Sequence, residues 1–498
     1  MDSFTKDAME LMDLPVEILE IIFDYLTVPD LKNASMVCLQ WSNMAFSGRR
    51  MHRVRLNVDF RNDDSQDYLT LLRRSKRQYR HVVLEIDSKK MTVISCFIEL
   101  LENFKRSVES LKLVSYYVEY SQIRDILLEV PNLKKLSLQA MVLLDHAQTA
   151  NLMPPSIKPL HQLTDLVLQS DSSLQLQPFD ICTFAPNLRK LDMDCDLTRA
   201  VEVFSHFSDR LKSVAVFFKT NAFFLRFCEI NFPELLEIDF YSDDEQFDDD
   251  AAVRTISTFF ARLKRLQMAT LRCNITQPIM NALIENCRDI TCLHIKTGNL
   301  ENRAFSGLAN LTKLKVLTLD GWLRSIVFED CKPLSALQEL RLHSIAMDHT
   351  LECFKKLSTM MPNLRKLDVI EQDMDDDCLH FICKNMVSLQ QMLLEICPNI
   401  TEDGFEYLNR LPHLFELSLG YLDLLQGFLV LIPPNEVKLL SLNRCDKLTD
   451  DDLMLIPHVF PLLTRLKIAS CHLITFAGIE RLRSQIPWCT VITEHILE

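Results

Sequence analysis

The apolar phrase leucine-x-x-leucine-x-leucine recurs along this chain about once every 25 residues, and this period constrains the fold more than any other feature. Clear copies of the phrase begin at Leu133, Leu163, Leu188, Leu314, Leu337, Leu364, Leu414 and Leu463. Its last three positions alternate apolar and polar residues, as a strand does when only one of its faces is buried. Helical stretches ending in Pro-Asn turns precede several copies, as at Pro131-Asn132 and Pro362-Asn363. The pattern therefore predicts a repeated unit of helix, turn and short strand, and hence an α/β fold.

The spacing of the predicted strands identifies the type of repeat. Successive strand centres are 23 to 30 residues apart, which is the range of leucine-rich repeats. One such unit cannot bury its apolar face alone, so neighbours must stack into a solenoid with a curved parallel sheet. Strands ~4.8 Å apart would form an inner arc on the order of 80 Å, which suits a protein partner better than a metabolite. We expect about 17 repeats, centred on Leu84, Leu111, Leu136, Leu166, Leu191, Val214, Ile238, Leu266, Leu293, Leu317, Leu340, Leu367, Met392, Leu417, Leu440, Leu466 and Val491.

Residues 12–50 do not follow the repeat. Between Val16 and Leu26, eight of eleven residues are apolar, which exceeds the single stripe that a surface helix needs. Pro29 predicts the end of this helix and the start of a second near Leu31, and a third is expected over 37–46. So small a unit cannot bury this much apolar surface by itself, and part of it is expected to face a partner.

The motifs of this segment resemble the F-box, a helical module of ubiquitin-ligase substrate receptors. The resemblance is carried by Leu14-Pro15-x-Glu17-Ile18-Leu19-x-x-Ile22-Phe23-x-Tyr25-Leu26, then Asp30-Leu31, Val37-Cys38 and Trp41. It implies docking on the S-phase-kinase-associated linker protein and, through it, on a cullin-RING core. It also implies a set of residues divided between the linker contact and the core of the module: Leu14, Pro15, Ile18, Ile22, Leu26, Leu31, Val37, Cys38 and Trp41.

The later repeats resemble the leucine-rich-repeat branch of the same family, in which a cysteine follows the strand. Cys397, Cys445 and Cys471 are each followed by an aliphatic residue and a threonine, and these threonines are predicted to be helix N-caps: Thr401, Thr449 and Thr475. Repeats before about residue 270 depart from this pattern. The resemblance implies a non-catalytic receptor that holds a protein substrate for ubiquitination and proteasomal degradation. Two alternatives remain, a repeat scaffold without ubiquitin transfer and a hydrolase on the concave face.

These patterns predict a flexible N-terminus over 1–11, an F-box over 12–50, a linker or capping segment over 51–80 and a solenoid over 81–498. The net charge of −14 argues against general attraction to nucleic acid or anionic membranes. The amino terminus carries no basic and apolar leader, so the 16 cysteines are expected to stay reduced, in the cytoplasm and/or nucleus. No apolar stretch reaches the ~20 residues of a membrane span.

Three local features are open to a structural or a functional interpretation. A basic run is predicted to be a solvated helix face: Arg73, Arg74, Lys76, Arg77 and Arg80. An acidic run is predicted to be a solvated loop, with a docking site for a basic partner as the alternative: Asp243, Asp244, Glu245, Asp248, Asp249 and Asp250. Trp322 is expected in the core, or else at the rim as an interface anchor.

Catalytic and metal motifs are sparse, and we expect no cofactor and no metal. The chain has only 8 glycines, and none forms a phosphate-binding loop. Zinc generally takes four ligands, whereas two groups offer three each: Cys378, His380 and Cys383, and Cys287, Cys292 and His294. No thiol is marked as activated by a cationic neighbour or a helix end.

Substrate recognition, if the resemblance holds, is expected at the solvent-facing positions between repeat leucines. Both signs of charge occur there, which favours a partner of particular shape and charge pattern. The predicted substrate-binding residues are Arg341, His343, Lys366, Asp368, Glu395, Ser441, Asn443, Arg465 and Lys467.

Overall fold

The computed structural model describes residues 14–60, 70, 72–86, 92–144, 158–169, 181–194, 200–218, 220–246, 250–296, 305–323, 331–347, 349–422, 429 and 432–494. The chain divides into two units, residues 1–207 and 208–498. The predicted flexible N-terminus over 1–11 lies outside the described residues.

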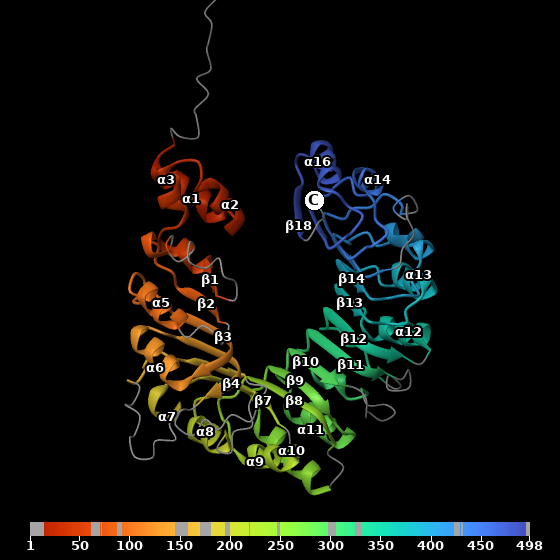
Figure 1. The fold of residues 1–498 in the computed structure, drawn as a ribbon. Helices are drawn as coiled ribbons and strands as arrows, with labels where there is room; N and C mark the ends of the chain where they lie inside the picture. Colours follow the sequence, from red (N-terminus) through yellow and green to blue (C-terminus); the bar gives the residue numbers. More distant parts are fainter. Residues whose placement is uncertain are drawn as a thin grey trace, which may run out of the picture. The chain divides into compact units, whose positions relative to one another are not determined.

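The first unit opens with three helices, α1 (Val16–Tyr25), α2 (Val28–Ala34) and α3 (Leu39–Ala45) (Figure 1). These confirm the predicted helical segment, although α2 begins three residues before Leu31. Pro29 lies in the first turn of α2, where a missing N–H costs nothing, and the Thr27 side chain caps that turn. Pro29 therefore does not separate the two helices as the sequence predicted.

A parallel sheet and its return helices make up the rest of the first unit. Strand β1 pairs with β2, and the order continues through β3, β4 and β5 to β6. The sheet thus begins in the segment predicted to be a linker or cap over 51–80, because β1 already lies against the first repeat. The elements are β1 (Arg55–Asp59), β2 (His81–Ile86), α5 (Thr92–Leu101), β3 (Ser110–Glu119), α6 (Tyr120–Glu129), β4 (Lys135–Leu144), β5 (Asp165–Gln169), α7 (Ile181–Phe184), β6 (Lys190–Asp194) and α8 (Ala200–Phe207).

The second unit continues the same alternation, again with parallel pairs from β7 through β18. Its helices lie together on one side of its strands (Figure 1). The strands are β7 (Ser213–Phe217), β8 (Glu237–Gln246), β9 (Met268–Asn274), β10 (Cys292–Lys296), β11 (Val316–Leu323), β12 (Glu339–Met347), β13 (Lys366–Ile370), β14 (Gln391–Glu395), β15 (Glu416–Gly420), β16 (Leu439–Asn443), β17 (Arg465–Ala469) and β18 (Thr490–Glu494). The helices are α9 (Asn221–Glu229), α10 (Asp250–Arg262), α11 (Gln277–Asn286), η3 (Leu308–Asn310), α12 (Thr350–Met360), α13 (Asp376–Asn385), η5 (Glu402–Arg410), α14 (Asp450–Leu453), α15 (Ile456–Val459) and α16 (Phe476–Gln485).

The repeat leucines form the core that the sequence predicted. Leu317, Leu340, Leu367 and Met392 are register partners on four adjacent strands, and all four are buried. Each strand therefore covers the apolar side chains of its neighbour, and no single repeat is closed. An α/β leucine-rich-repeat solenoid is the fold of the described repeats.

Earlier repeats of the second unit fill the same space with aromatic rings. Phe227, Phe240 and Phe259 are each less than 2% exposed. Their ring centroids lie 5.7–5.9 Å apart, a normal separation for packed aromatic pairs. Phenylalanine side chains fill this part of the core, so the repeats around Phe227, Phe240 and Phe259 depart from the leucine and cysteine pattern of the later repeats.

Two predicted strand centres were wrong. In β9 it is Ala269, not Leu266, that pairs with Ile238 and Leu293, because a small alanine holds the middle position and Leu266 precedes the strand. In β2 it is Val82 that pairs with Leu111, two residues before Leu84.

Polar side chains tie each repeat to the next. Thr401, Thr449 and Thr475 cap the return helices as predicted. Thr475 also donates from its backbone N–H and its hydroxyl to the Asp450 carboxylate, at 2.9 and 2.6 Å. Asp376 accepts the same pair of bonds from Thr401, at 2.8 and 2.6 Å. Each aspartate thus clamps the following repeat.

The asparagines of the Pro-Asn turns make a second connection between repeats. Asn132, Asn187 and Asn363 each donate from Nδ2 to a backbone carbonyl of the preceding turn, at 2.8, 2.8 and 2.9 Å. The Pro-Asn turns therefore end the helices and also join neighbouring repeats by hydrogen bonds.

Left-handed backbone marks the ends of strands β12 to β17. Six residues that are not glycine have a positive φ between 47° and 55°, one inside β12 and five directly after β13 to β17: Ser344, Glu371, Ile396, Tyr421, Arg444 and Ser470. For ordinary residues this conformation costs about 1–2 kcal/mol each. All six keep a side chain at the edge of the sheet, and we call them the left-handed row.

Candidate functional site

Helix α1 carries two opposite apolar stripes. Leu19 and Phe23 point inward and are buried. Ile18, Ile21 and Tyr25, spaced i, i+3 and i+7, are exposed by 44, 54 and 86%. A helix needs one apolar stripe to pack on its own domain, so the second, which we call the α1 stripe, is available to a partner.

The connection between α2 and α3 exposes a second group of apolar side chains. Met36, Val37 and Leu39 are exposed by 73, 55 and 84%. Scattered apolar residues are normal on a surface, but three within four positions beside an apolar helix are not. We call them the connector group.

The inward residues of these helices form a small closed core. Leu19, Phe23, Leu31, Met44 and Ala45 are buried together, with Leu14, Leu26 and Trp41 partly buried against them. The Trp41 ring meets Phe23 edge-on, with centroids 5.3 Å apart. Cys38 caps α3 by accepting from the Trp41 N–H at 3.4 Å. The core holds the α1 stripe in place from behind.

A buried guanidinium fixes the end of this helical segment. Arg50, in η2 (Gly48–Arg53), is only 5% exposed. It pairs with Asp24 at 2.7 Å and donates to the Met44 carbonyl at 2.9 Å. Because a buried charge is tolerated only when paired and hydrogen-bonded, this contact locks η2 onto α1 and α3.

The predicted linker-binding residues separate into two groups. Leu31 is buried, Cys38 is a cap, and Leu14, Leu26 and Trp41 pack against the core. Pro15, Ile18 and Val37 are exposed, and Ile22 is half-buried. A division between core and surface was expected, and the structure assigns each side chain its position.

Sequence reasoning missed several exposed apolar residues: Val16, Ile21, Tyr25, Met36 and Leu39. The i, i+3, i+7 spacing of Ile18, Ile21 and Tyr25 is visible in the sequence and was the available signal for the α1 stripe. The connector group carries no periodicity, so only the structure identifies it.

A family model described as F-box-like matches residues 11–57, which include all three helices and η2. The amino-terminal segment is an F-box-like domain. The strand β1 falls at the end of that match, so the F-box-like domain runs directly into the sheet. A comparison with curated proteins found no match to the chain.

Solved structures resemble the chain only distantly. The TLR13–ssRNA13 complex matches with 15% identity and a TM-score of 0.46, over 85% of this chain and 58% of that one. The yeast Rad7 and Elc1 complex matches with 13% identity and a TM-score of 0.39, over 97% and 98% of the two chains. The mouse RP105/MD-1 complex matches with 16% identity and a TM-score of 0.43, over 84% and 76%. The chain thus spans less than two thirds of the TLR13 chain.

The second candidate surface is the open face of the sheet, the side of strands β10–β18 that the helices do not cover. Glu339 accepts from Arg341 at 2.7 Å and from Lys366 at 2.8 Å. Lys366 also reaches Asp368 at 3.1 Å, and Arg341 reaches it at 3.6 Å. These four residues form one network across β12 and β13.

Asp368 does not face solvent as the sequence predicted. It is 6% exposed, because Lys366 and Arg341 lie over it, and its Oδ1 has no hydrogen-bond partner in the described chain. The other predicted substrate residues are at least partly exposed. Lys467 pairs with Glu494 at 3.0 Å, and Arg465 is exposed.

Glu395 lies in an unfavourable position for its charge. Burial, and then the nearby Asp368 carboxylate, raise the pKa of Glu395 above its ordinary 4.5. A Cβ placed on Gly420 of β15 would come within 2.9 Å of Glu395 Cγ, so the Glu395 side chain lies over this glycine. The folded chain therefore holds a proton on Glu395 more tightly than the unfolded chain does.

Replacing Glu395 with glutamine is expected to stabilise the protein at neutral pH. The pKa of Glu395 is higher in the folded chain than in the unfolded chain. The stability of the wild-type protein therefore falls as the pH rises from the ordinary pKa of 4.5 through the raised pKa of the folded chain. The advantage of Glu395→Gln should therefore shrink as the pH is lowered toward 4.5 and below. Thermal melting of both proteins across this range measures the difference.

Glu352→Gln is the matched control, since Lys355 lowers the pKa of Glu352. This variant should be less stable than the wild type at neutral pH, and the difference should disappear in acid. The expected change in stability is opposite in sign to that of Glu395→Gln. A Glu395→Gln advantage that grows on acidification would contradict the assignment.

The remaining candidates form no site in the described chain. No group of three or more metal-binding side chains occurs there. His380 contacts the Asp403 carbonyl at 2.8 Å, while burial raises the pKa of Cys378 and Cys383 to about 12. No cysteine with a described side chain forms a disulfide. The described helices include none that combines the length and apolar character of a membrane crossing.

The three local features have different outcomes. The basic run is not one solvated helix face, because Arg73 pairs with Glu99 at 2.6 Å, Arg77 lies over the Phe46 ring and Arg80 pairs with Glu109 at 2.8 Å. The acidic run is not the loop that the sequence predicted, because Asp243, Asp244 and Glu245 lie in strand β8 and Asp250 begins α10. The side chain of Trp322 lies outside the described residues, so the prediction for it stands untested.

Proposed function

We propose that this protein is the substrate-recognition subunit of an SCF-type ubiquitin ligase. The single observation that carries the proposal is the α1 stripe within the F-box-like domain: three apolar side chains that the domain itself leaves uncovered. The resemblance to F-box proteins supplies the partner, the S-phase-kinase-associated linker, with a cullin-RING core beyond it.

In this proposal the protein acts by proximity. The F-box-like domain attaches the chain to the ligase, and the repeats hold a protein substrate so that its lysines meet a ubiquitin-charged enzyme. Tethering two reactants raises their effective concentration, so the receptor needs no acid, base or nucleophile of its own. Burial raises the pKa of Cys273, Cys287 and Cys397 to about 12, so these three thiols stay protonated and are poor nucleophiles.

Reconstitution with purified linker and cullin tests the attachment. We expect the full chain to co-purify with both, and the linker to be required for cullin binding. Failure to bind the linker would leave the alternative, a leucine-rich-repeat scaffold without ubiquitin transfer.

Charge reversal on the open face tests the substrate-binding prediction. Partners captured by the full chain in cells are expected to be lost, by about tenfold or more, from an Arg465→Glu, Lys467→Glu variant, because like charges across an interface are repulsive. An Arg365→Glu, Lys384→Glu variant makes the same charge change at exposed positions outside the open face. Equal capture by both variants would exclude this part of the face, and quantitative mass spectrometry gives the comparison.

A further inference from the structure

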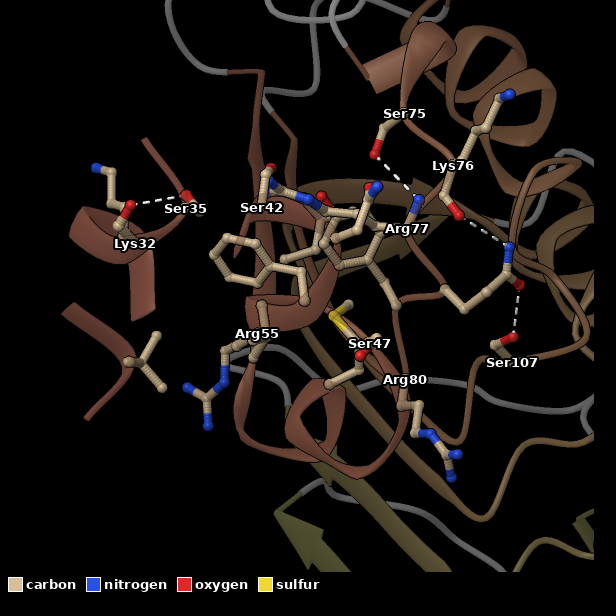
Figure 2. Close-up of a pocket in the computed structure, with 18 of the residues that line it drawn as sticks. Lys32, Ser35, Ser42, Ser47, Arg55, Ser75, Lys76, Arg77, Arg80 and Ser107 are labelled. Atoms are coloured by element: carbon tan, nitrogen blue, oxygen red, sulfur yellow. Dashed lines mark hydrogen bonds between the residues drawn. The ribbon is translucent and has the colours of Figure 1, made fainter. Parts of the chain in front are cut away.

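A wide cavity separates the F-box-like domain from the first repeats, and the proposed function does not use it. Its volume is about 1540 Å³, and α2, η2, β1 and residues 72–80 line it (Figure 2). All of these elements belong to the first unit. We call it the junction groove.

The groove is strongly basic. Six cationic side chains line it, and none of the described lining residues is an acid: the cations are Lys32, Arg55, Arg74, Lys76, Arg77 and Arg80. The whole chain carries a net charge of −14, so composition does not explain this bias. Figure 2 shows Lys32 on one side of the groove, Arg55 and Arg77 near its middle, and Lys76 on the other side.

Most of these cations have no internal partner. Lys32, Arg55, Arg74 and Lys76 make no side-chain hydrogen bond or ion pair with any described residue. Arg77 stacks on Phe46, with its guanidinium carbon 3.8 Å from the ring centroid. Several like charges around one cavity repel one another, and an anionic ligand would relieve that repulsion.

A second cavity of about 330 Å³ extends the basic surface along the turns before β3, β4 and β5. It shares Arg80 and Ser107 with the junction groove and adds Arg106 and Lys134. Glu109 is its acid, and it is already paired with Arg80 at 2.8 Å and with Lys134 at 3.0 Å. Two adjoining cavities suit an extended ligand better than a single compact ion.

The lining argues for a polypeptide. The groove is larger than the roughly 300–1,000 Å³ of ordinary small-molecule sites. Single-stranded nucleic acid would need free aromatic faces for base stacking, whereas Tyr79 is buried and Arg77 covers Phe46. Apolar side chains, among them Val28 and Met36, line the groove together with the cations and suit a peptide of mixed character.

We propose that the junction groove binds an acidic segment of a partner protein, whose carboxylates pair with Arg55, Arg74 and Lys76 while its apolar residues contact the groove floor. The Ser42 hydroxyl supplies a further hydrogen-bond donor, whereas the hydroxyls of Ser47 and Ser107 already donate to the Met44 carbonyl and to Gln78. The site does not include the α1 stripe; of the connector group it includes Met36, while Val37 and Leu39 do not line it.

Direct binding of a defined peptide tests the proposal. A fluorescein-labelled peptide of alternating glutamate and leucine is titrated with the full chain, alone and in complex with the linker, and anisotropy is recorded at rising salt. Binding is expected in both forms and should weaken with salt, because screening acts on exposed charges. An Arg55→Glu, Arg74→Glu, Lys76→Glu variant should bind about tenfold more weakly or worse.

Two further variants sharpen the result. Lys313→Glu, Lys332→Glu, Lys384→Glu makes the same charge change at exposed positions of the second unit and should leave binding unchanged. Glu109→Gln releases Arg80 and Lys134 and should tighten binding. The proposal would be overturned if both triple variants lost binding equally, or if adding the linker abolished binding. It would also be overturned if a peptide with glutamine in place of glutamate, or oligothymidylate, bound as tightly as the acidic peptide. Linker affinity of the same variants, measured in parallel, reports separately on the ligase assignment.

Discussion

Replacing Ile18 and Ile21 with glutamate is expected to abolish linker binding while leaving the fold intact. Both side chains are about half exposed and belong to the α1 stripe, so a charge there meets water in the free protein. In the complex the same charge would be buried without a partner. Central interface residues of this kind contribute about 2 kcal/mol or more each, so the pair should weaken binding by about a hundredfold or more.

Three companion variants make the measurement specific. Val37→Glu with Leu39→Glu tests whether the connector group belongs to the same interface, and we expect a comparable loss. Asn33→Glu with Gln40→Glu places the same charges at exposed polar positions of α2 and α3 and should bind normally. Trp41→Ala should instead remove binding by unfolding the domain, since losing a packed aromatic costs about 3–5 kcal/mol. Linker affinity by interferometry and thermal melting of each variant separate the cases; undiminished affinity in both glutamate pairs would sink the receptor assignment.

Replacing Gly478 with alanine is expected to destabilise the last repeats, although alanine normally favours a helix by about 1 kcal/mol over glycine. A Cβ at Gly478 would come 2.1 Å from Asp450 Oδ1 and would displace this carboxylate. Asp450 would then lose both bonds to Thr475. Hydrogen bonds to charged groups contribute about 1.5–3 kcal/mol each, so we expect a loss of about 2 kcal/mol or more.

A double-mutant cycle tests the cause. Once Asp450→Ala has removed the clamp, Gly478→Ala should be neutral or stabilising, so the two changes should not add. Gly307→Ala is the control, because its Cβ would meet only Ile284 Cγ2 at 3.3 Å. Amide exchange in α16 together with thermal melting records the effect, and strictly additive losses would show that the clash with Asp450 is not its origin.

The leucine phrase predicted most strands because a leucine on a half-buried strand has little choice of face. It failed where another apolar residue held the same position, as at Ala269 and Val82. The search for leucine missed these positions, because the fold requires a side chain that fits the available volume there and not leucine itself. The first strand was hidden for a similar reason. Residues 55–59 alternate correctly, but one isolated copy next to a helical segment shows no period.

The candidate site was predictable in kind but not in detail. The apolar excess of the first helix predicted a partner surface, yet which isoleucines face outward depends on how α1 packs on Phe23 and Trp41. The burial of Asp368 depends on Lys366 of its own strand and on Arg341 of the neighbouring strand, and the second contact is not encoded within one repeat. The junction groove depends on residues from both sides of a boundary, and it arises only when the F-box-like domain meets the sheet.

The left-handed row has a consequence for how such a chain can change over evolutionary time. A glycine at each strand end would remove the conformational cost of the left-handed backbone, but it would also remove a side chain from the edge of the sheet. Because six non-glycine residues hold these places, each repeat from β12 to β17 presents one side chain at or near the end of its strand. Substitution along this edge can retarget the surface one repeat at a time, while the scaffold beneath it remains the same.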